Sequence, residues 1–162
     1  MDSYIKIDGW RSNIRFSSAH VIPEYEKCGR LHGHTYAIHA RLFGTRDEKG
    51  IILDFTIIKH ILKDLADQLD HHILIPGDSP SISIKDINNQ LTLNSLGKTY
   101  VFPKQDCIIL PLSSTSAENL ASYILETIIQ KMKKMNENIP LSKIEIGVDE
   151  GYGQGAFISK SF

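Results

Sequence analysis

The sequence predicts an α+β domain in which an antiparallel four-stranded sheet carries two helices on one face. Apolar residues alternate along four segments, 12–20, 32–43, 143–149 and 156–159, as they do in half-buried strands. Two further segments carry apolar residues at helical spacing. The resulting order, β-β-α-(hairpin)-α-β-β, is typical of an α+β fold. With 162 residues, 41% of them hydrophobic, the chain is long enough to form one domain with its own core.

The first two strands are predicted from alternation. Along residues 12–20, Ile14, Phe16 and His20 fall on one face, because successive strand residues point to opposite sides. Residues 32–43 also place every second residue on one face: His34, Tyr36, Ile38, Ala40 and Leu42. The connecting residues, 21–31, contain proline, glycine and charges and indicate a loop. We expect the two strands to pair antiparallel.

Two amphipathic helices follow. The first has Asp54 as a candidate N-cap and an apolar stripe at Ile58, Ile61, Leu62, Leu65 and Leu69. The second begins after Leu112, where Thr115 and Glu118 have the spacing of a capping box. Its apolar stripe is Leu120, Tyr123, Ile124, Ile128, Met132 and Met135. Each helix therefore has one face to bury against the sheet.

The remaining segments complete the predicted sheet and add an insertion. Residues 76–107 are irregular, and Leu91–Leu93 with Thr99–Phe102 suggest hairpin strands around residues 94–98. Further on, Ile144, Ile146 and Val148 share the inward face of a strand, which a glycine-rich turn connects to the final strand. We therefore predict a single domain over residues 1–162 with a hairpin insertion at about 76–107.

Charge and composition exclude several classes of function. The net charge is −1, from 18 basic and 19 acidic residues, so no general affinity for nucleic acid or anionic membranes is expected. No apolar stretch is long enough for a transmembrane helix, and the first residues do not have the pattern of a secretory signal. The two cysteines cannot form a disulfide framework. We expect a cytoplasmic protein.

Three of the seven histidines have the spacing of a metal site. His32 and His34 are two residues apart and share a strand face, and His20 ends the preceding strand on its apolar face. If the strands pair, three imidazoles converge, and three protein ligands with an open position are typical of catalytic zinc. The alternative is that these are separate surface or hydrogen-bonded histidines. His39 and His60 have no comparable candidate ligands beside them and are expected at the surface.

Cys28 lies four residues before His32 and permits two interpretations. It could be a fourth zinc ligand in a closed structural site, or a nearby thiolate that acts as base or nucleophile. The sequence does not separate them. Cys107 precedes an apolar run and is expected to be a core thiol.

Two acidic residues add candidates. Asp70 precedes His71 at the end of the first helix and could orient its imidazole, although both could simply end the helix. Glu150 continues the inward face of its strand, where a carboxylate needs a partner. It could accept two parallel N–H bonds from an amino-pyrimidinone, or it could form a salt bridge at the strand end.

Together these motifs resemble those of the 6-pyruvoyl-tetrahydropterin synthase / 6-carboxy-tetrahydropterin synthase family. The resemblance spans nearly the whole chain and rests on Phe16-Ser17-Ser18-Ala19-His20, Cys28-Gly29-Arg30-Leu31-His32-Gly33-His34, Asp54-Phe55, Leu69-Asp70-His71, Thr115-Ser116-Ala117-Glu118-Asn119 and Glu150. It implies a tunnelling (T-) fold in which trimers close a barrel of antiparallel strands and two trimers form a hexamer. Active sites then lie between subunits.

The resemblance also implies roles for single residues. His20, His32 and His34 would bind zinc, Cys28 would be the catalytic base, Asp70 and His71 would assist it, and Glu150 would anchor a pterin ring. His72, beside His71, leaves open which imidazole faces the site. The residues that would contact a triphosphate cannot be identified from the sequence.

The family substrate is 7,8-dihydroneopterin triphosphate. One branch forms 6-pyruvoyl-tetrahydropterin. The other releases acetaldehyde and triphosphate and forms 6-carboxy-5,6,7,8-tetrahydropterin, a precursor of 7-deazaguanine nucleosides such as queuosine and archaeosine. The short gap between Cys28 and His32 resembles the carboxy branch. The alternatives are the pyruvoyl synthase, an aldolase-like cleavage of dihydroneopterin, and a non-catalytic pterin- or zinc-binding module.

Overall fold

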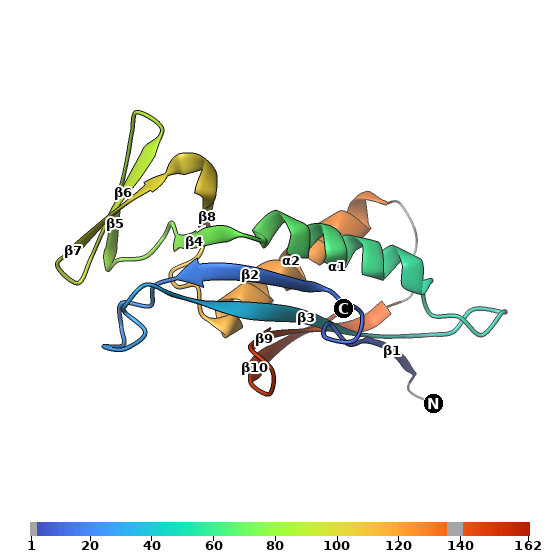
Figure 1. Cartoon of the computed structure of the whole chain (residues 1–162). Helices are drawn as coiled ribbons and strands as arrows, with labels where there is room; N and C mark the ends of the chain where they lie inside the picture. Colours follow the sequence, from blue (N-terminus) through green and yellow to red (C-terminus); the bar gives the residue numbers. More distant parts are fainter. Residues whose placement is uncertain (1–2, 136–140) are drawn as a thin grey trace.

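The computed structural model describes residues 3–135 and 141–162 as two helices and two sheets (Figure 1). The larger sheet has seven strands in the order β10-β9-β3-β2-β4-β8, and β1 pairs with β3 beside β2. Its strands are β1 (Tyr4–Ile7), β2 (Arg15–His20), β3 (His32–Gly44), β4 (His72–Pro76), β8 (Cys107–Leu110), β9 (Leu141–Glu150) and β10 (Gly155–Ser161). The 3₁₀ turn η1 (Lys104–Asp106) precedes β8.

The predicted α+β class holds, but the predicted four-stranded antiparallel sheet is wrong in its extent. The four expected strands are β2, β3, β9 and β10, and they are antiparallel neighbours. However, β4 joins β2 in parallel, and β8 joins β4 in parallel, so the sheet is mixed. The cores of the two added strands, Ile73–Ile75 and Ile108–Leu110, are short continuous apolar runs. Such runs lack alternation, so periodicity does not identify them as strands.

Helices α1 (Phe55–Leu69) and α2 (Ala117–Lys134) pack on the same face of the larger sheet (Figure 1). The cap of α1 is the predicted one, because the Asp54 carboxylate accepts a hydrogen bond from Thr56 N at 2.8 Å. The predicted cap of α2 is off by one residue. Ser116 is the N-cap, and its hydroxyl accepts from Asn119 N at 3.3 Å. Thr115 is instead buried beside His20.

The main core lies between this sheet face and the helices. Even-numbered residues of β2, β3 and β9 face the helices, and Phe16 stacks on Tyr36 with ring centroids 4.6 Å apart. Burying each large apolar side chain contributes about 1.5–3 kcal/mol. The same parity carries His20, His32, His34 and Glu150 onto the helix-covered face at one end of the sheet. The core pattern thus fixes which way the candidate site faces.

The insertion is a separate three-stranded antiparallel sheet. It comprises β5 (Ile82–Ile87), β6 (Gln90–Ser95) and β7 (Lys98–Pro103). The hairpin predicted around residues 94–98 is β6–β7, while β5 was not predicted. One face of this sheet buries a second small core, formed by Val21, Ile75, Ile82, Leu91 and Leu93.

Two sequence expectations about histidines have different outcomes. His60 is exposed, as expected, whereas the expectation that His39 lies at the surface is wrong, since its side chain is only 12% exposed. The turn at Gly9 covers His39 and donates its N–H to Nδ1, while Nε2 lies 3.0 Å from Asp149 Oδ2. Within the described residues, no helix is long and apolar enough to cross a membrane.

Candidate active site

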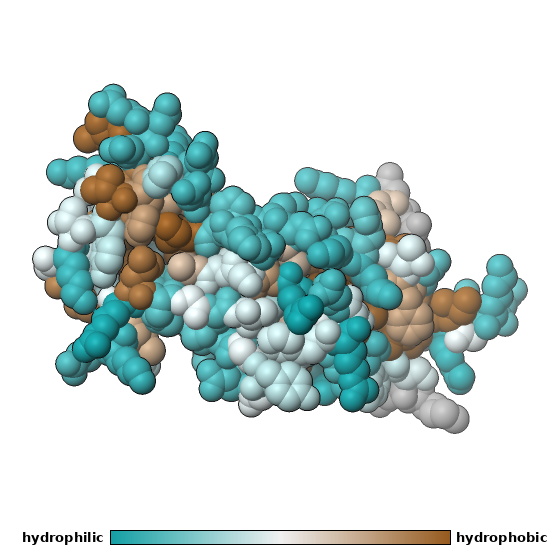
Figure 2. All heavy atoms as spheres, viewed as in Figure 1, coloured by the Kyte–Doolittle hydropathy of each residue, from teal (hydrophilic) through white to brown (hydrophobic). Residues whose placement is uncertain are grey.

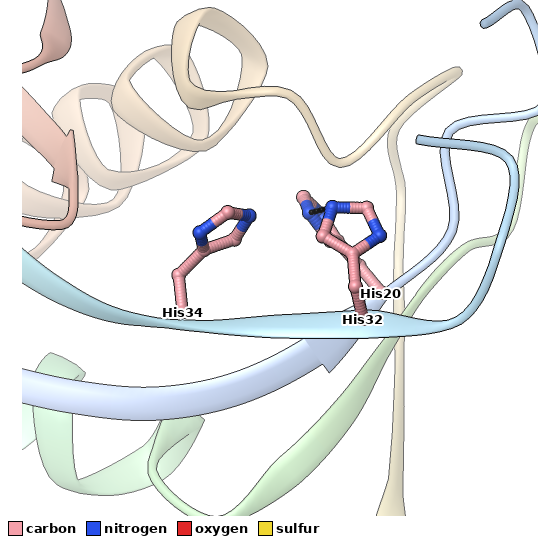
Figure 3. Close-up of side chains that lie close together, drawn as sticks. All are labelled: His20, His32 and His34. Atoms are coloured by element: carbon pink, nitrogen blue, oxygen red, sulfur yellow. Dashed lines mark hydrogen bonds between the residues drawn. The ribbon is translucent and has the colours of Figure 1, made fainter. Parts of the chain in front are cut away.

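Three histidines converge at the end of the larger sheet. His20 on β2 is the register partner of His32 on β3, and His34 projects from β3 to the same side (Figure 3). One ligand nitrogen from each ring lies within 4.8 Å of the others, and His20 Nε2 is 3.1 Å from His32 Nε2. The geometry therefore brings together the three residues that strand spacing selected, and a metal ion is the group that three such imidazoles bind.

Backbone carbonyls orient two of these rings. Thr115 O lies 3.0 Å from His20 Nδ1, and Arg30 O lies 2.7 Å from His32 Nδ1. Since a carbonyl only accepts, each Nδ1 carries the proton and each Nε2 keeps a lone pair for a metal. His34 Nε2 is buried and has no hydrogen-bond partner among the described residues. An unsatisfied nitrogen beside two oriented lone pairs fits a metal ion well.

Burial keeps the first histidine neutral. Burial, followed by the neighbouring His32, lowers the pKa of His20 to about 4. The same two causes lower the pKa of His34. Tyr36 lies beneath this cluster, with its hydroxyl 3.3 Å from His20 Nδ1, and burial raises the pKa of its phenol. Neutral imidazole is the form that binds a metal, so these shifts favour binding at neutral pH.

Cys28 lies outside the histidine cluster and lines an adjoining cavity of about 830 Å³. This arrangement favours an open three-histidine site over the closed site in which Cys28 is a fourth ligand. The cavity is also lined by Glu24, Glu118 and Glu150. Cys107 is half-buried against the second core and donates to Pro103 O at 3.5 Å, broadly as expected for a core thiol.

Glu150 presents an unsatisfied carboxylate to this cavity. It ends β9 opposite Tyr36 of β3, and its Oε1 is buried without a hydrogen-bond partner among the described residues. The salt bridge considered as its alternative is not formed there. Burial raises the pKa of Glu150, the neighbouring His32 lowers it in part, and the charge of Glu118 raises it. A buried acceptor of this kind suits a ligand that offers N–H donors.

Asp70 and His71 form a hydrogen-bonded pair, and His71 lines a different cavity from that of Cys28. Asp70 Oδ2 lies 2.7 Å from His71 Nδ1, and Asp70 Oδ1 accepts from Ser17 N at 2.7 Å. Burial alone would raise the pKa of Asp70, but these hydrogen bonds hold it below its usual value. His71 is 83% exposed and lines a cavity of about 560 Å³ with Ser17 and Thr35. Ser17 and Thr35 are odd-numbered strand residues and belong to the sheet face opposite the histidine cluster, although His34 also lines this cavity.

The backbone explains why His71, and not His72, is the exposed member. His71 has a positive φ of 58°, which turns its side chain outward next to Asp70. His72 instead begins β4, and its Nδ1 lies 2.7 Å from Asp70 O. A positive φ is uncommon for a residue other than glycine and marks a locally constrained position.

Sequence reasoning gave no site role to several residues that surround the cluster. Thr115 and Glu118 were interpreted as a capping box and as part of a family motif without a stated role, yet one orients His20 and the other lines the cavity. Tyr36 was placed only on one face of a predicted strand. The signal that could have found them is position: each lies on the helix-covered face or at the start of α2, close to predicted ligands.

In comparisons with known proteins, the matching family model and similar proteins carry the names of tetrahydropterin synthases. A family model described as 6-pyruvoyl tetrahydropterin synthase matches residues 10–159. A Methanocaldococcus jannaschii protein, provisionally named a 6-carboxy-5,6,7,8-tetrahydropterin synthase, is 34% identical over 157 residues, or 96% of each chain. An Aquifex aeolicus protein named 6-carboxy-5,6,7,8-tetrahydropterin synthase is 24% identical over 130 residues, covering 77% of this chain and 73% of the relative.

Solved structures with a similar fold carry the other product name. The Plasmodium falciparum 6-pyruvoyl tetrahydropterin synthase has a TM-score of 0.90 and 29% identity, with 99% of each chain covered. The Plasmodium vivax 6-pyruvoyl tetrahydropterin synthase has a TM-score of 0.91 and 26% identity, covering 100% of this chain and 99% of the other. The three-stranded sheet of residues 82–103 falls within these matched lengths.

Proposed function

Because this chain belongs to the 6-pyruvoyl tetrahydropterin synthase family, we propose that it is a zinc-dependent 6-carboxy-5,6,7,8-tetrahydropterin synthase. Its substrate would be 7,8-dihydroneopterin triphosphate, and acetaldehyde and triphosphate would be released with the carboxy product. The family and the named relatives indicate a lyase of the tetrahydropterin synthase type. The product would feed the synthesis of 7-deazaguanine nucleosides such as queuosine or archaeosine in the cytoplasm.

The single observation that carries the metal assignment is the orientation of the imidazoles. His20, His32 and His34 would hold zinc through Nε2, because the carbonyls of Thr115 and Arg30 occupy two Nδ1 atoms and His34 Nε2 lacks a partner. When bound, zinc would act as a Lewis acid that polarises the hydroxyl groups of the substrate side chain.

Cys28 and Glu150 would act on the substrate within one cavity. The Glu150 carboxylate would accept hydrogen bonds from the amino group and ring N–H of the pterin, which fixes the ring. The Cys28 thiolate would move a proton at the substrate side chain. Both side chains line the same cavity beside the histidine cluster. This shared location supports a role for Glu150 in binding the ring while Cys28 transfers the proton.

Asp70 and His71 would serve the site of another copy of the chain. Their cavity lies on the opposite sheet face from Cys28, and the exposed His71 carries a hydrogen bond to Asp70 that leaves Nε2 free. We propose a homo-oligomer, a hexamer built from two trimers that close a barrel of strands, in which each site combines residues of two subunits. His71, oriented by Asp70, would then exchange protons with substrate.

The carboxy product is favoured by two observations. Cys28 precedes His32 by four residues, and the relative at 34% identity carries the carboxy name. The test is to incubate zinc-loaded protein with 7,8-dihydroneopterin triphosphate and identify the products by mass spectrometry with an acetaldehyde trap. The proposal requires the mass of 6-carboxy-tetrahydropterin together with trapped acetaldehyde.

The second candidate is 6-pyruvoyl-tetrahydropterin synthase. It is favoured by the solved structures, which match nearly the whole chain and bear that name. In the same experiment it predicts a pyruvoyl product without acetaldehyde. Tight binding of the pterin or of zinc without turnover would instead favour a non-catalytic binding module.

A further inference from the structure

The loop of residues 21–31, which carries Cys28, rests at both ends on the three-stranded sheet. Val21 is buried in the second core together with residues of β5 and β6. Leu31 lines a narrow apolar cavity with Leu93 and Tyr100 of the same sheet. Figure 2 shows hydrophobic side chains gathered over this part of the molecule. The loop is therefore seated on the insertion rather than on the main core.

The turn between β6 and β7 contacts this loop at Gly29, next to Cys28. A β-carbon placed on Gly29 would lie only 2.6 Å from Leu96 Cδ1, so the Leu96 methyl group lies directly against the Gly29 backbone. Gly29 follows Cys28, and the next residue, Arg30, supplies the carbonyl that orients His32. Leu96 thus contacts the short segment that joins the candidate base to a candidate metal ligand.

Backbone hydrogen bonds fix the same segment from within the loop. Cys28 O accepts from Ile22 N at 2.8 Å, and Gly29 N donates to Tyr25 O at 2.6 Å. Pro80, in the connection that leads into β5, lines the cavity of Cys28. The insertion therefore contributes Pro80 to the wall of the cavity and Leu96 to the packing against the loop backbone at Gly29.

Leu96 occupies a conformation that leucine disfavours. It is 53% exposed, and its φ is +53°, followed by +73° at Gly97. Two-residue hairpin turns with positive φ at both positions favour Asn-Gly, because asparagine tolerates the left-handed region. A bulky residue remains there only when its surroundings compensate the strain. In this structure, the contact with Gly29 is the interaction that compensates the backbone strain at Leu96.

We propose that Leu96 is a positioning residue that holds the Cys28 loop in place, so that the three-stranded sheet supports the active-site loop. Removing the side chain lets Gly29 move toward the vacated space and shifts the Cys28 thiol relative to the histidine cluster. The inference rests on the proposed function of Cys28.

The test compares Leu96→Asn with Leu96→Met, in full-length zinc-loaded protein. The matched control is Val101→Thr, at an exposed position of β7 on the same sheet. Leu96→Asn creates the favoured Asn-Gly turn, so we expect its thermal midpoint to be equal to or above that of the wild type. Its kcat should still fall about three- to tenfold with little change in KM, since small displacements of a reacting group slow chemistry. Leu96→Met should restore most of the rate.

A second readout does not need the substrate. In a Cys107→Ser background, Cys28 is the remaining thiol, and we expect Leu96→Asn to change its alkylation rate by iodoacetamide at fixed pH about threefold or more. Unchanged kcat and unchanged alkylation in Leu96→Asn would overturn the proposal, as would a loss of stability without altered thiol reactivity. A wild-type protein without synthase activity would refute the proposed function, while the alkylation rates would still decide the role of Leu96.

Discussion

The two faces of the large sheet differ in how much of a candidate active site each one contains. On the helix-covered face, three histidines converge beside a cavity lined by Cys28 and Glu150, and backbone carbonyls orient His20 and His32. On the opposite face, Asp70 holds the exposed His71, which lines a second cavity with Ser17 and Thr35. One face thus brings a candidate metal cluster next to a cavity within a single chain. The other presents the exposed His71, hydrogen-bonded to Asp70, which in the proposed oligomer would serve the site of a neighbouring subunit.

The largest expected effect is the loss of metal from the helix-covered face. His32→Ala removes one of three ligands, so we expect zinc content to collapse and turnover to fall about 10³-fold or more. Inductively coupled plasma mass spectrometry and the product assay measure both quantities. His60→Ala, at an exposed position on α1, is the control. A His32→Ala protein with full zinc and full activity would refute the metal assignment.

Cys28→Ala separates a base from a fourth ligand. Since the histidine cluster forms without Cys28, zinc should be retained while turnover drops about 10²–10⁴-fold, the usual range for a proton-transferring group. Zinc analysis of the same sample as the kinetic assay provides the comparison. Loss of zinc in Cys28→Ala would restore the closed four-ligand site that the sequence left open.

A smaller effect concerns the electrostatics of the cavity. Glu118→Gln removes a negative charge that raises the pKa of Glu150, so that pKa should move down toward its usual value. Side-chain carboxyl NMR titration measures this shift. The pKa of Asp70, on the other sheet face, should stay the same and serves as the internal control. An unchanged Glu150 pKa would mean that Glu118 does not contribute to it and that burial and His32 set it.

The smallest effect is the pH dependence of the metal-free protein. His20 has a folded-state pKa of about 4, lowered by burial and then by His32, from 6.5. Between these values the unfolded chain binds the extra proton, so stability rises with pH and is lost as pH falls from 6.5 toward 4. The loss should be about 1–3 kcal/mol. Urea unfolding from pH 4 to 7 measures it, and His20→Asn should flatten the slope. An equal slope in both proteins would contradict the assignment to His20.

The sequence predicted the histidine cluster because alternation alone determines the face of a strand residue. His32 and His34 share a face in any register, and His20 needed only the pairing of two neighbouring strands. The face of His71 depends on features without a local signal. These are the parallel pairing of β4 with β2 and the left-handed backbone of His71. Likewise, Leu96 meets Gly29 through tertiary packing that no spacing in the sequence reveals.

In the proposed oligomer, each active site combines the helix-covered sheet face of one subunit with the opposite sheet face of another. The direct test mixes Cys28→Ala with His71→Ala in equal amounts, after unfolding and joint refolding with zinc. Each variant alone should be nearly inactive. In random mixed oligomers, half of the sites keep Cys28 and half of those meet an intact His71, so about 25% of wild-type activity should return. If both residues served one site within a single chain, every site would keep a defect. Absence of any recovery in verified mixed oligomers would therefore contradict the account.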